Sequence, residues 1–282
     1  MNTLSIEKKV AVVRALVEGC SIRSTERMTG VAKQTILRLL AEVGKACAEY
    51  QDRVIRNVSA KRVQVDEIWS YVGCKQKNVT VEKIEAGICG DVWTFTAIEA
   101  QSKLVISWMV GRRDAGCATE FLRDVEKRLS NRIQLTTDGH KMYLEAVPDA
   151  FRESGIDYAQ LVKVYGNDPE GMKRYSPAQC LGTQRVEVLG TPDSKHISTS
   201  YVELQNLNMR MQMRRFTRLT NAFSKKIENQ VHSIALFHMH YNFVRIHQTL
   251  RVSPAMAAGL TNRLWAIRDI IALTENAIQL AA

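Results

Sequence analysis

The order of strand-like and helix-like segments between residues 62 and 165 constrains the fold of this chain most. Three successive segments there are rich in Val, Ile, Trp, Phe and Thr, which favour strands, and they span 62–72, 91–100 and 103–111. Helical spacing and short apolar runs then alternate at 116–130, 132–138, 140–151 and 157–165. Three antiparallel strands followed by helix, strand, helix and strand predict a mixed sheet with helices on its faces.

After residue 165 the sequence predicts an insertion followed by a helical C-terminal segment. Residues 166–198 are rich in Gly, Pro, Asn and Asp and are too long for a plain connector. We interpret them as an insertion in which 179–190 forms a hairpin. From residue 200 onward the pattern is helical, so residues 62–282 are expected to form one α/β domain. The element order is that of an RNase H-like mixed-sheet catalytic core, here with a helical C-terminal segment.

Residues 1–48 have the pattern of a small all-α domain. Ser5 precedes a helix with apolar residues at helical spacing, Ser21 starts a short second helix, and Gly30 separates it from a third. This arrangement predicts an N-terminal helix-turn-helix, whose residues facing the DNA major groove would be Lys33, Gln34, Thr35 and Arg38. A three-helix protein-interaction module is the alternative. The charged segment 49–61 is interpreted as a linker helix.

Charge favours a polyanionic partner. The chain has 39 Lys and Arg against 29 Asp and Glu, a net charge of +10, and nucleic acid is the common polyanion. No apolar run reaches the length of a membrane span, so no membrane partner is expected. The six cysteines lack the spacing of a zinc site, and no signal peptide is evident. We expect a cytoplasmic, nucleoid-associated protein.

Three carboxylates stand where a phosphoryl-transfer site would need them. Asp66 lies within a strand-like run, Asp138 ends another, and Glu203 begins a helix-like segment. Such a fold can bring acids from two neighbouring strands and a later helix together. Two Mg²⁺ ions held by carboxylates can activate an attacking oxygen and stabilise a departing one in phosphodiester cleavage. An Asp inside an apolar strand is unfavourable, and a bound metal would offset its cost.

Each acid also has a simpler interpretation. Asp138 can form an Asx-turn before His140, and Glu203 can be a first-turn acid favoured by the helix dipole. Side chains alternate along a strand, so Asp66 and Glu67 are expected to point to opposite faces of the sheet. We therefore expect that they cannot serve one site. Asn206 follows Glu203 along the same helix face and is a candidate contact for a phosphate, as is His140.

The segment 204–226 contains no acid and is expected to be a basic helix that follows DNA phosphates. A solvated basic face is the alternative. Its candidate DNA-binding residues are Arg210, Arg214, Arg215, Arg218, Lys225 and Lys226.

The chain resembles the DDE transposases of the insertion sequence one family. The resemblance rests on VQVDEIWSYVG, LTTDGHKMY, HISTSYVELQNLNMRMQMRRFTRLTNAFSKKIENQ and HYNFVRIHQTLRVSPAMAAGL, and it covers most of residues 1–270. It implies Mg²⁺-dependent cleavage at element ends and transfer of the 3′-OH strand into target DNA. Under this resemblance Asp66, Asp138 and Glu203 would be the catalytic metal ligands.

Three features depart from the family pattern. Leu204 stands where members often carry an Arg, the cysteine-based zinc finger of many relatives is absent, and the insertion 166–198 lengthens the distance between Asp138 and Glu203. Recognition of element ends is therefore expected to depend on the helix-turn-helix.

The sequence thus predicts a DNA transposase that uses Mg²⁺, with Mn²⁺ as a substitute. Its expected partner is double-stranded DNA, both as element ends and as target. A homodimer or higher homo-oligomer is expected, because transposases of this class pair two ends. One alternative is a catalytically impaired, transposase-derived repressor or scaffold, which Leu204 favours. Another is an RNase H-like nuclease that does not transpose, although it would not need the N-terminal helices.

Overall fold

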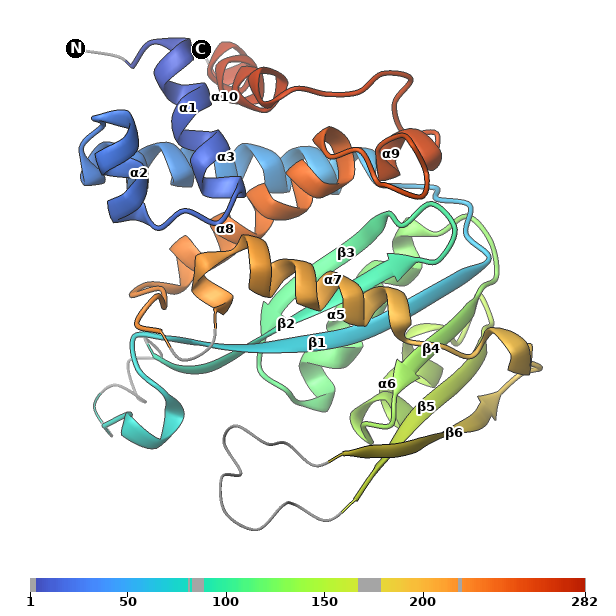
Figure 1. Cartoon of the computed structure of the whole chain (residues 1–282). Helices are drawn as coiled ribbons and strands as arrows, with labels where there is room; N and C mark the ends of the chain where they lie inside the picture. Colours follow the sequence, from blue (N-terminus) through green and yellow to red (C-terminus); the bar gives the residue numbers. More distant parts are fainter. Residues whose placement is uncertain (1–3, 81, 83–88, 167–178, 218–219, 282) are drawn as a thin grey trace.

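The computed structural model describes residues 4–80, 82, 89–166, 179–217 and 220–281. A six-stranded sheet in the order β3-β2-β1-β4-β5-β6 forms its centre (Figure 1). The strands are β1 Arg62–Val72, β2 Gly90–Glu99, β3 Val105–Gly111, β4 Gln134–Asp138, β5 Asp157–Tyr165 and β6 Cys180–Leu189. The pairs β1–β2, β2–β3 and β5–β6 are antiparallel, whereas β4 is parallel to both β1 and β5. The predicted mixed sheet is confirmed, and it is consistent with an RNase H-like core.

Helices cover both faces of this sheet. Helices α5 (Ala115–Arg128) and α6 (Met142–Ala150) pack on one face, and α7 (Ser200–Gln212) crosses β1 and β2 on the other (Figure 1). Helix α7 is held at its start by β1, because Oε1 of Gln64 accepts hydrogen bonds from the backbone N–H groups of Tyr201 and Val202, at 2.8 and 3.2 Å. This contact fixes the position of the polar face of α7 over β1.

The three predicted N-terminal helices are present as α1 (Ile6–Val17), α2 (Ile22–Thr29) and α3 (Lys33–Val54). Ser5 and Ser21 cap α1 and α2 with their hydroxyls, as expected of N-cap serines. Helix α3 runs on to Val54, so part of the segment 49–61 continues α3 instead of forming a separate linker helix. DNA binding by α2 and α3 remains a prediction.

The C-terminal helices connect the N-terminal helices to the sheet. They are α8 (Ile227–Met239), α9 (Pro254–Ala257) and α10 (Ile267–Ala281), with a π-helical turn over His240–Val244. Helices α3 and α8 cross so closely that a Cβ added at Gly44 would lie 2.5 Å from Cβ of His232. One hydrophobic cluster includes Ile36 of α3 and Val65 of β1. None of the described helices is long and apolar enough to cross a membrane.

The predicted basic helix over 204–226 is wrong in its second half. Helix α7 ends at Gln212, a short 3₁₀ turn covers Arg214–Phe216, and Met213 has an extended backbone. Met213 and Phe216 are buried in a cluster with Ile68 of β1. Tertiary packing therefore overrides the helical pattern, and Arg214 and Arg215 do not share a helix face with Arg210.

The predicted hairpin within 179–190 is also wrong. These residues form a single strand, β6, which pairs with β5 and becomes the edge of the sheet. Most β6 residues are exposed. Residues 167–178 of the proposed insertion lie outside the described residues.

Candidate functional site

Asp66 lies near the middle of β1 and faces α7. Its Oδ2 accepts a hydrogen bond of 2.9 Å from Nδ2 of Asn206, and its Oδ1 accepts one of 2.8 Å from the backbone N–H of Glu67. Burial, and then the neighbouring carboxylates of Glu67 and Asp138, raise the pKa of Asp66 to about 7. Burial first, and then the two neighbouring negative charges, disfavour the ionised form of Asp66.

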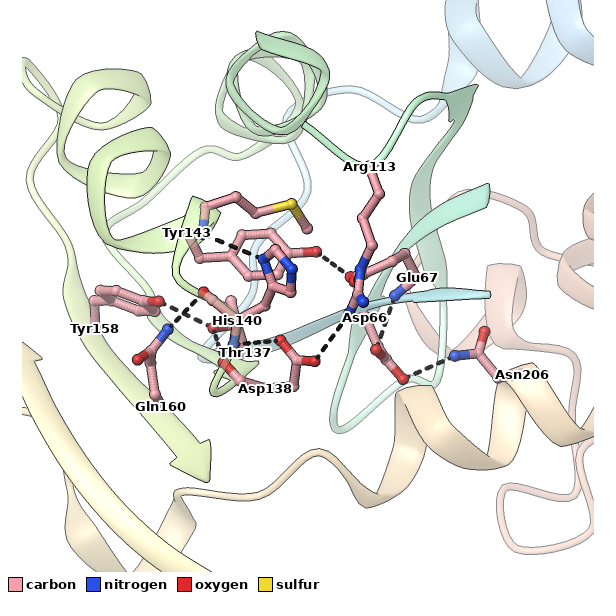
Figure 2. Close-up of polar contacts among 11 residues, drawn as sticks. Asp66, Glu67, Arg113, Thr137, Asp138, His140, Tyr143, Tyr158, Gln160 and Asn206 are labelled. Atoms are coloured by element: carbon pink, nitrogen blue, oxygen red, sulfur yellow. Dashed lines mark hydrogen bonds and ion pairs between the residues drawn. The ribbon is translucent and has the colours of Figure 1, made fainter. Parts of the chain in front are cut away.

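Glu67 points to the opposite face, toward α6 and the loop between β3 and α5, where its side chain has no exposed surface. Its Oε2 accepts a 2.7 Å hydrogen bond from the hydroxyl of Tyr143, and its Oε1 is paired with Nε of Arg113 (Figure 2). Burial and the charge of Asp138 raise the pKa of Glu67, while the two donors oppose that shift. The guanidinium of Arg113 also lies 4.5 Å from the ring centre of Trp93.

Asp138 is the last residue of β4. Its Oδ1 accepts a 3.0 Å hydrogen bond from the backbone N–H of His140, which is the Asx-turn that the sequence allowed. Its Oδ2 lies 3.7 Å from Nη2 of Arg113. The carbonyl of His140 accepts a hydrogen bond from Gln160 of β5, and its Nδ1 accepts one from a backbone N–H. The turn therefore places one carboxylate oxygen toward β1.

These three acids form the one group of potential metal ligands found among the described residues. One ligand atom from each of Asp66, Glu67 and Asp138 lies within 4.8 Å of the others. Backbone pairing explains their approach: β1 and β4 are paired only as far as Val65 and Thr137. From Asp66 until the bridge between Val72 and Ser224, this edge of β1 is unpaired among the described residues, and side chains from either face can reach the end of β4.

The expectation that Asp66 and Glu67 cannot share one site is therefore wrong. Alternation itself holds, since Asp66 bonds to α7 and Glu67 to α6. The open strand edge nevertheless lets both carboxylates approach Asp138. Neither a pattern of alternation nor the separate strand assignments could predict where the pairing of β1 with β4 stops.

A divalent cation fits this donor set. Carboxylate oxygens are the ligands that Mg²⁺ and Mn²⁺ prefer. Burial and the neighbouring carboxylates raise the pKa of Asp66 and of Glu67, although Arg113 pairs with Glu67 and lies near Asp138. In addition, Oδ1 of the buried Asn206 has no hydrogen-bond partner within the described part of the chain, so an acceptor oxygen remains available beside Asp66.

Glu203 lies outside this group. It is in the first turn of α7, where Oε2 forms a 2.6 Å ion pair with Nζ of Lys163 on β5 and Oε1 accepts a hydrogen bond from Thr199. Its charge contributes to the raised pKa of Asp66, so the two acids interact electrostatically. Metal binding by Glu203 remains a prediction.

The predicted DNA-binding residues have different surroundings. On α3, Lys33, Gln34 and Arg38 are exposed and Thr35 is half-buried. Arg214, Lys225 and Lys226 are exposed, Arg210 is half-buried, and Arg218 lies outside the described residues. Arg215 is half-buried and donates hydrogen bonds to the hydroxyls of Ser224 and Ser233.

Three further residues that contact acids, Arg113, Tyr143 and Lys163, were not predicted from the sequence. Tyr143 on α6 and Arg113 in the loop between β3 and α5 contact Glu67, whereas Lys163 on β5 contacts Glu203. Their positions depend on which strands become neighbours. The available signal was that Lys163 lies on the predicted strand 157–165 and Tyr143 on the predicted helix directly after Asp138.

No protein-family model matches the chain, and no curated protein matches it. Solved structures with matches include a chain of a simian T-cell lymphotropic virus intasome in complex with the PP2A regulatory subunit B56 gamma, determined by cryo-electron microscopy. The two are 14% identical, the match covers 88% of this chain and 73% of that chain, and the TM-score is 0.43. The likeness is too distant to establish a family.

Proposed function

We propose that this protein is a divalent-metal-dependent enzyme that cleaves and joins DNA phosphodiester bonds, as a transposase does. The observation that carries the proposal is the approach of three carboxylates, Asp66, Glu67 and Asp138, to within 4.8 Å at the open edge between β1 and β4. Gathering like charges in a partly buried place is costly. A site that holds cations is a physical reason for such an arrangement.

The residues of this site would have distinct roles. Asp66 and Asp138 would bind the metal from two neighbouring strands, and Asn206 would hold the carboxylate of Asp66 in place. A bound divalent ion supplies Lewis acidity for phosphodiester chemistry. Arg113 would add a fixed positive charge beside the substrate phosphate, and Glu67 would keep its guanidinium in position.

DNA as the substrate is supported by charge and by exposed residues. The net charge of +10 favours a polyanion. Helix α3 begins with exposed Lys33 and Gln34 and carries exposed Arg38, the residues expected to face the major groove. The resemblance of the sequence to DDE transposases points to the same substrate, with transfer of a 3′-OH strand as the second step.

A cleavage assay on duplex DNA with and without Mg²⁺ tests this proposal. The wild-type chain should nick its DNA only when Mg²⁺ or Mn²⁺ is present, and Asp138→Asn should lower the rate at least about 100-fold. Asp149→Asn is the matched control, since Asp149 is a partly exposed acid at the end of α6. Cleavage that persists in the Asp138 variant would refute the assignment.

One observation favours a second candidate, a DNA-binding protein that does not cut. Glu203 is paired with Lys163 and lies outside the carboxylate group. If this pairing also holds on DNA, the site lacks the helix-borne acid that the resemblance implies. The same assay separates the two functions, because a non-cutting protein would bind duplex DNA and leave it intact with either metal.

A further inference from the structure

A second polar feature lies away from the carboxylate group, in a cavity of about 110 Å³. Its walls come from the α1–α2 turn, the segment around residue 214, residues 222–223 and helix α8. The polar lining residues include Ser21, Arg214, Arg215 and Ser233, and the remaining walls are largely apolar. The cavity thus joins the N-terminal helices to the segment that follows α7.

Arg215 lines this cavity and has no acidic partner among the described residues. Its Nε donates a 2.6 Å hydrogen bond to Oγ of Ser224, and its Nη1 donates one of 2.5 Å to Oγ of Ser233. Ser224 donates in turn to Oε1 of Gln230, so the network continues through neutral groups. The sequence supports this picture, because no acid occurs between Glu203 and Glu228.

The guanidinium of Arg215 is half-buried and has no carboxylate partner among the described residues. This is unfavourable, because partly removing a charge from water costs more than a neutral hydrogen bond returns. Burial lowers the pKa of Arg215 to about 10, yet the group is still charged at neutral pH. Apolar walls such as Phe237 reduce screening and strengthen any attraction to an anion. The missing negative charge is therefore expected to come from a ligand.

The chemistry of the lining selects a phosphate group. A guanidinium binds phosphate through parallel N–H donors, and the two serine hydroxyls use only part of the donor set of Arg215. Arg214 brings a second positive charge to the cavity, and Ser21 and Ile22, at the start of α2, also line it. A cavity of 110 Å³ has room for one phosphate group.

We propose that this cavity is a phosphate-binding site in which Arg215, assisted by Arg214 and Ser233, holds one backbone phosphate of bound DNA. This inference rests on the proposed function, since it takes DNA as the ligand. It adds an anchoring point next to the turn that begins α2, so that the segment after α7 and the helix-turn-helix would hold the same DNA strand.

Inorganic phosphate is the first probe. Phosphate at about twenty times its dissociation constant should raise the thermal midpoint of the wild-type chain by roughly 3 °C over chloride of equal ionic strength. Arg215→Gln should abolish this shift. Arg152→Gln, which removes an exposed arginine and the same charge, should preserve it. If Arg215→Gln does not fold, Ser233→Ala and Arg215→Lys provide milder changes, each expected to reduce the shift.

Duplex DNA is the second probe and identifies the source of the phosphate. Loss of one phosphate contact should reduce the slope of log affinity against log salt by about 0.9 in Arg215→Gln and leave it unchanged in Arg152→Gln. A phosphate shift that does not depend on Arg215 overturns the site. An unchanged salt slope in folded Arg215→Gln overturns DNA as its ligand. Neither outcome changes the result of the Mg²⁺-dependent cleavage assay. The proposed function is therefore tested separately from the phosphate site.

Discussion

Replacing Asp66 by Asn should stabilise the metal-free protein above neutral pH. The folded chain raises the pKa of Asp66 from 3.8 to about 7, first through burial and then through Glu67 and Asp138. Because the unfolded chain ionises this group at a lower pH than the folded chain does, wild-type stability falls as pH rises from about 4 to 7. Below pH 3.8 the group is protonated in both states and contributes no cost.

The magnitude follows from the size of the shift. About three pKa units, at 1.36 kcal/mol each, give a cost of about 4 kcal/mol at pH 8. Asn cannot replace both carboxylate oxygens as acceptors for Asn206 and for the N–H of Glu67, and one lost hydrogen bond costs about 1 kcal/mol. The net gain in unfolding free energy expected for Asp66→Asn is therefore about 3 kcal/mol.

Urea unfolding in the presence of a chelator measures this gain at pH 8 and again at pH 4.5. The difference between Asp66→Asn and wild type should be large at pH 8 and should shrink at pH 4.5, whereas Asp149→Asn should show no such pattern. Equal stability of Asp66→Asn and wild type at pH 8, or a difference independent of pH, would refute the reasoning. Ionised Asp66 would then not be destabilised by burial and by its neighbouring carboxylates.

Three further changes test other parts of the structure. Tyr143→Phe removes the hydroxyl donor to the buried carboxylate of the site and should lower the unfolding free energy by about 1–2 kcal/mol, measured by urea unfolding. Glu203→Gln breaks a half-exposed pair with Lys163 and should change stability by less than about 1 kcal/mol, yet abolish Mg²⁺-dependent cleavage if Glu203 acts in catalysis. Gly44→Ala should cost about 2–3 kcal/mol, seen as a lower thermal midpoint, because its methyl group would meet the backbone of His232; an unchanged midpoint would contradict the close crossing of α3 and α8.

The sheet could be predicted from the sequence because its strands carry strong local signals. The limits of β1 and β5 agree with the apolar and β-branched runs at 62–72 and 157–165. Local signals failed where distant contacts decide the conformation. The chain after Gln212 leaves the helix because Met213 and Phe216 pack beside Ile68 of β1, and helical spacing carries no information about that partner.

In the candidate site too, local sequence signals predict some positions and distant contacts decide the others. Asp66 and Asp138 could be predicted as neighbours, since each belongs to a strand of one sheet. The proximity of Glu67 depends on where β1 stops pairing with β4, and the pairing of Glu203 depends on β5 passing below α7. The end of the β1–β4 pairing and the position of β5 relative to α7 are both set by tertiary structure. The sequence within a few residues of each acid does not predict either of them.

The most direct test of the central claim is diffraction from crystals soaked in Mn²⁺, using its anomalous scattering. We expect a Mn²⁺ peak bound by the carboxylates of Asp66 and Asp138, and we expect crystals of Asp138→Asn to lack it. Absence of any peak there at millimolar Mn²⁺, or a peak held only by other residues, would contradict the account.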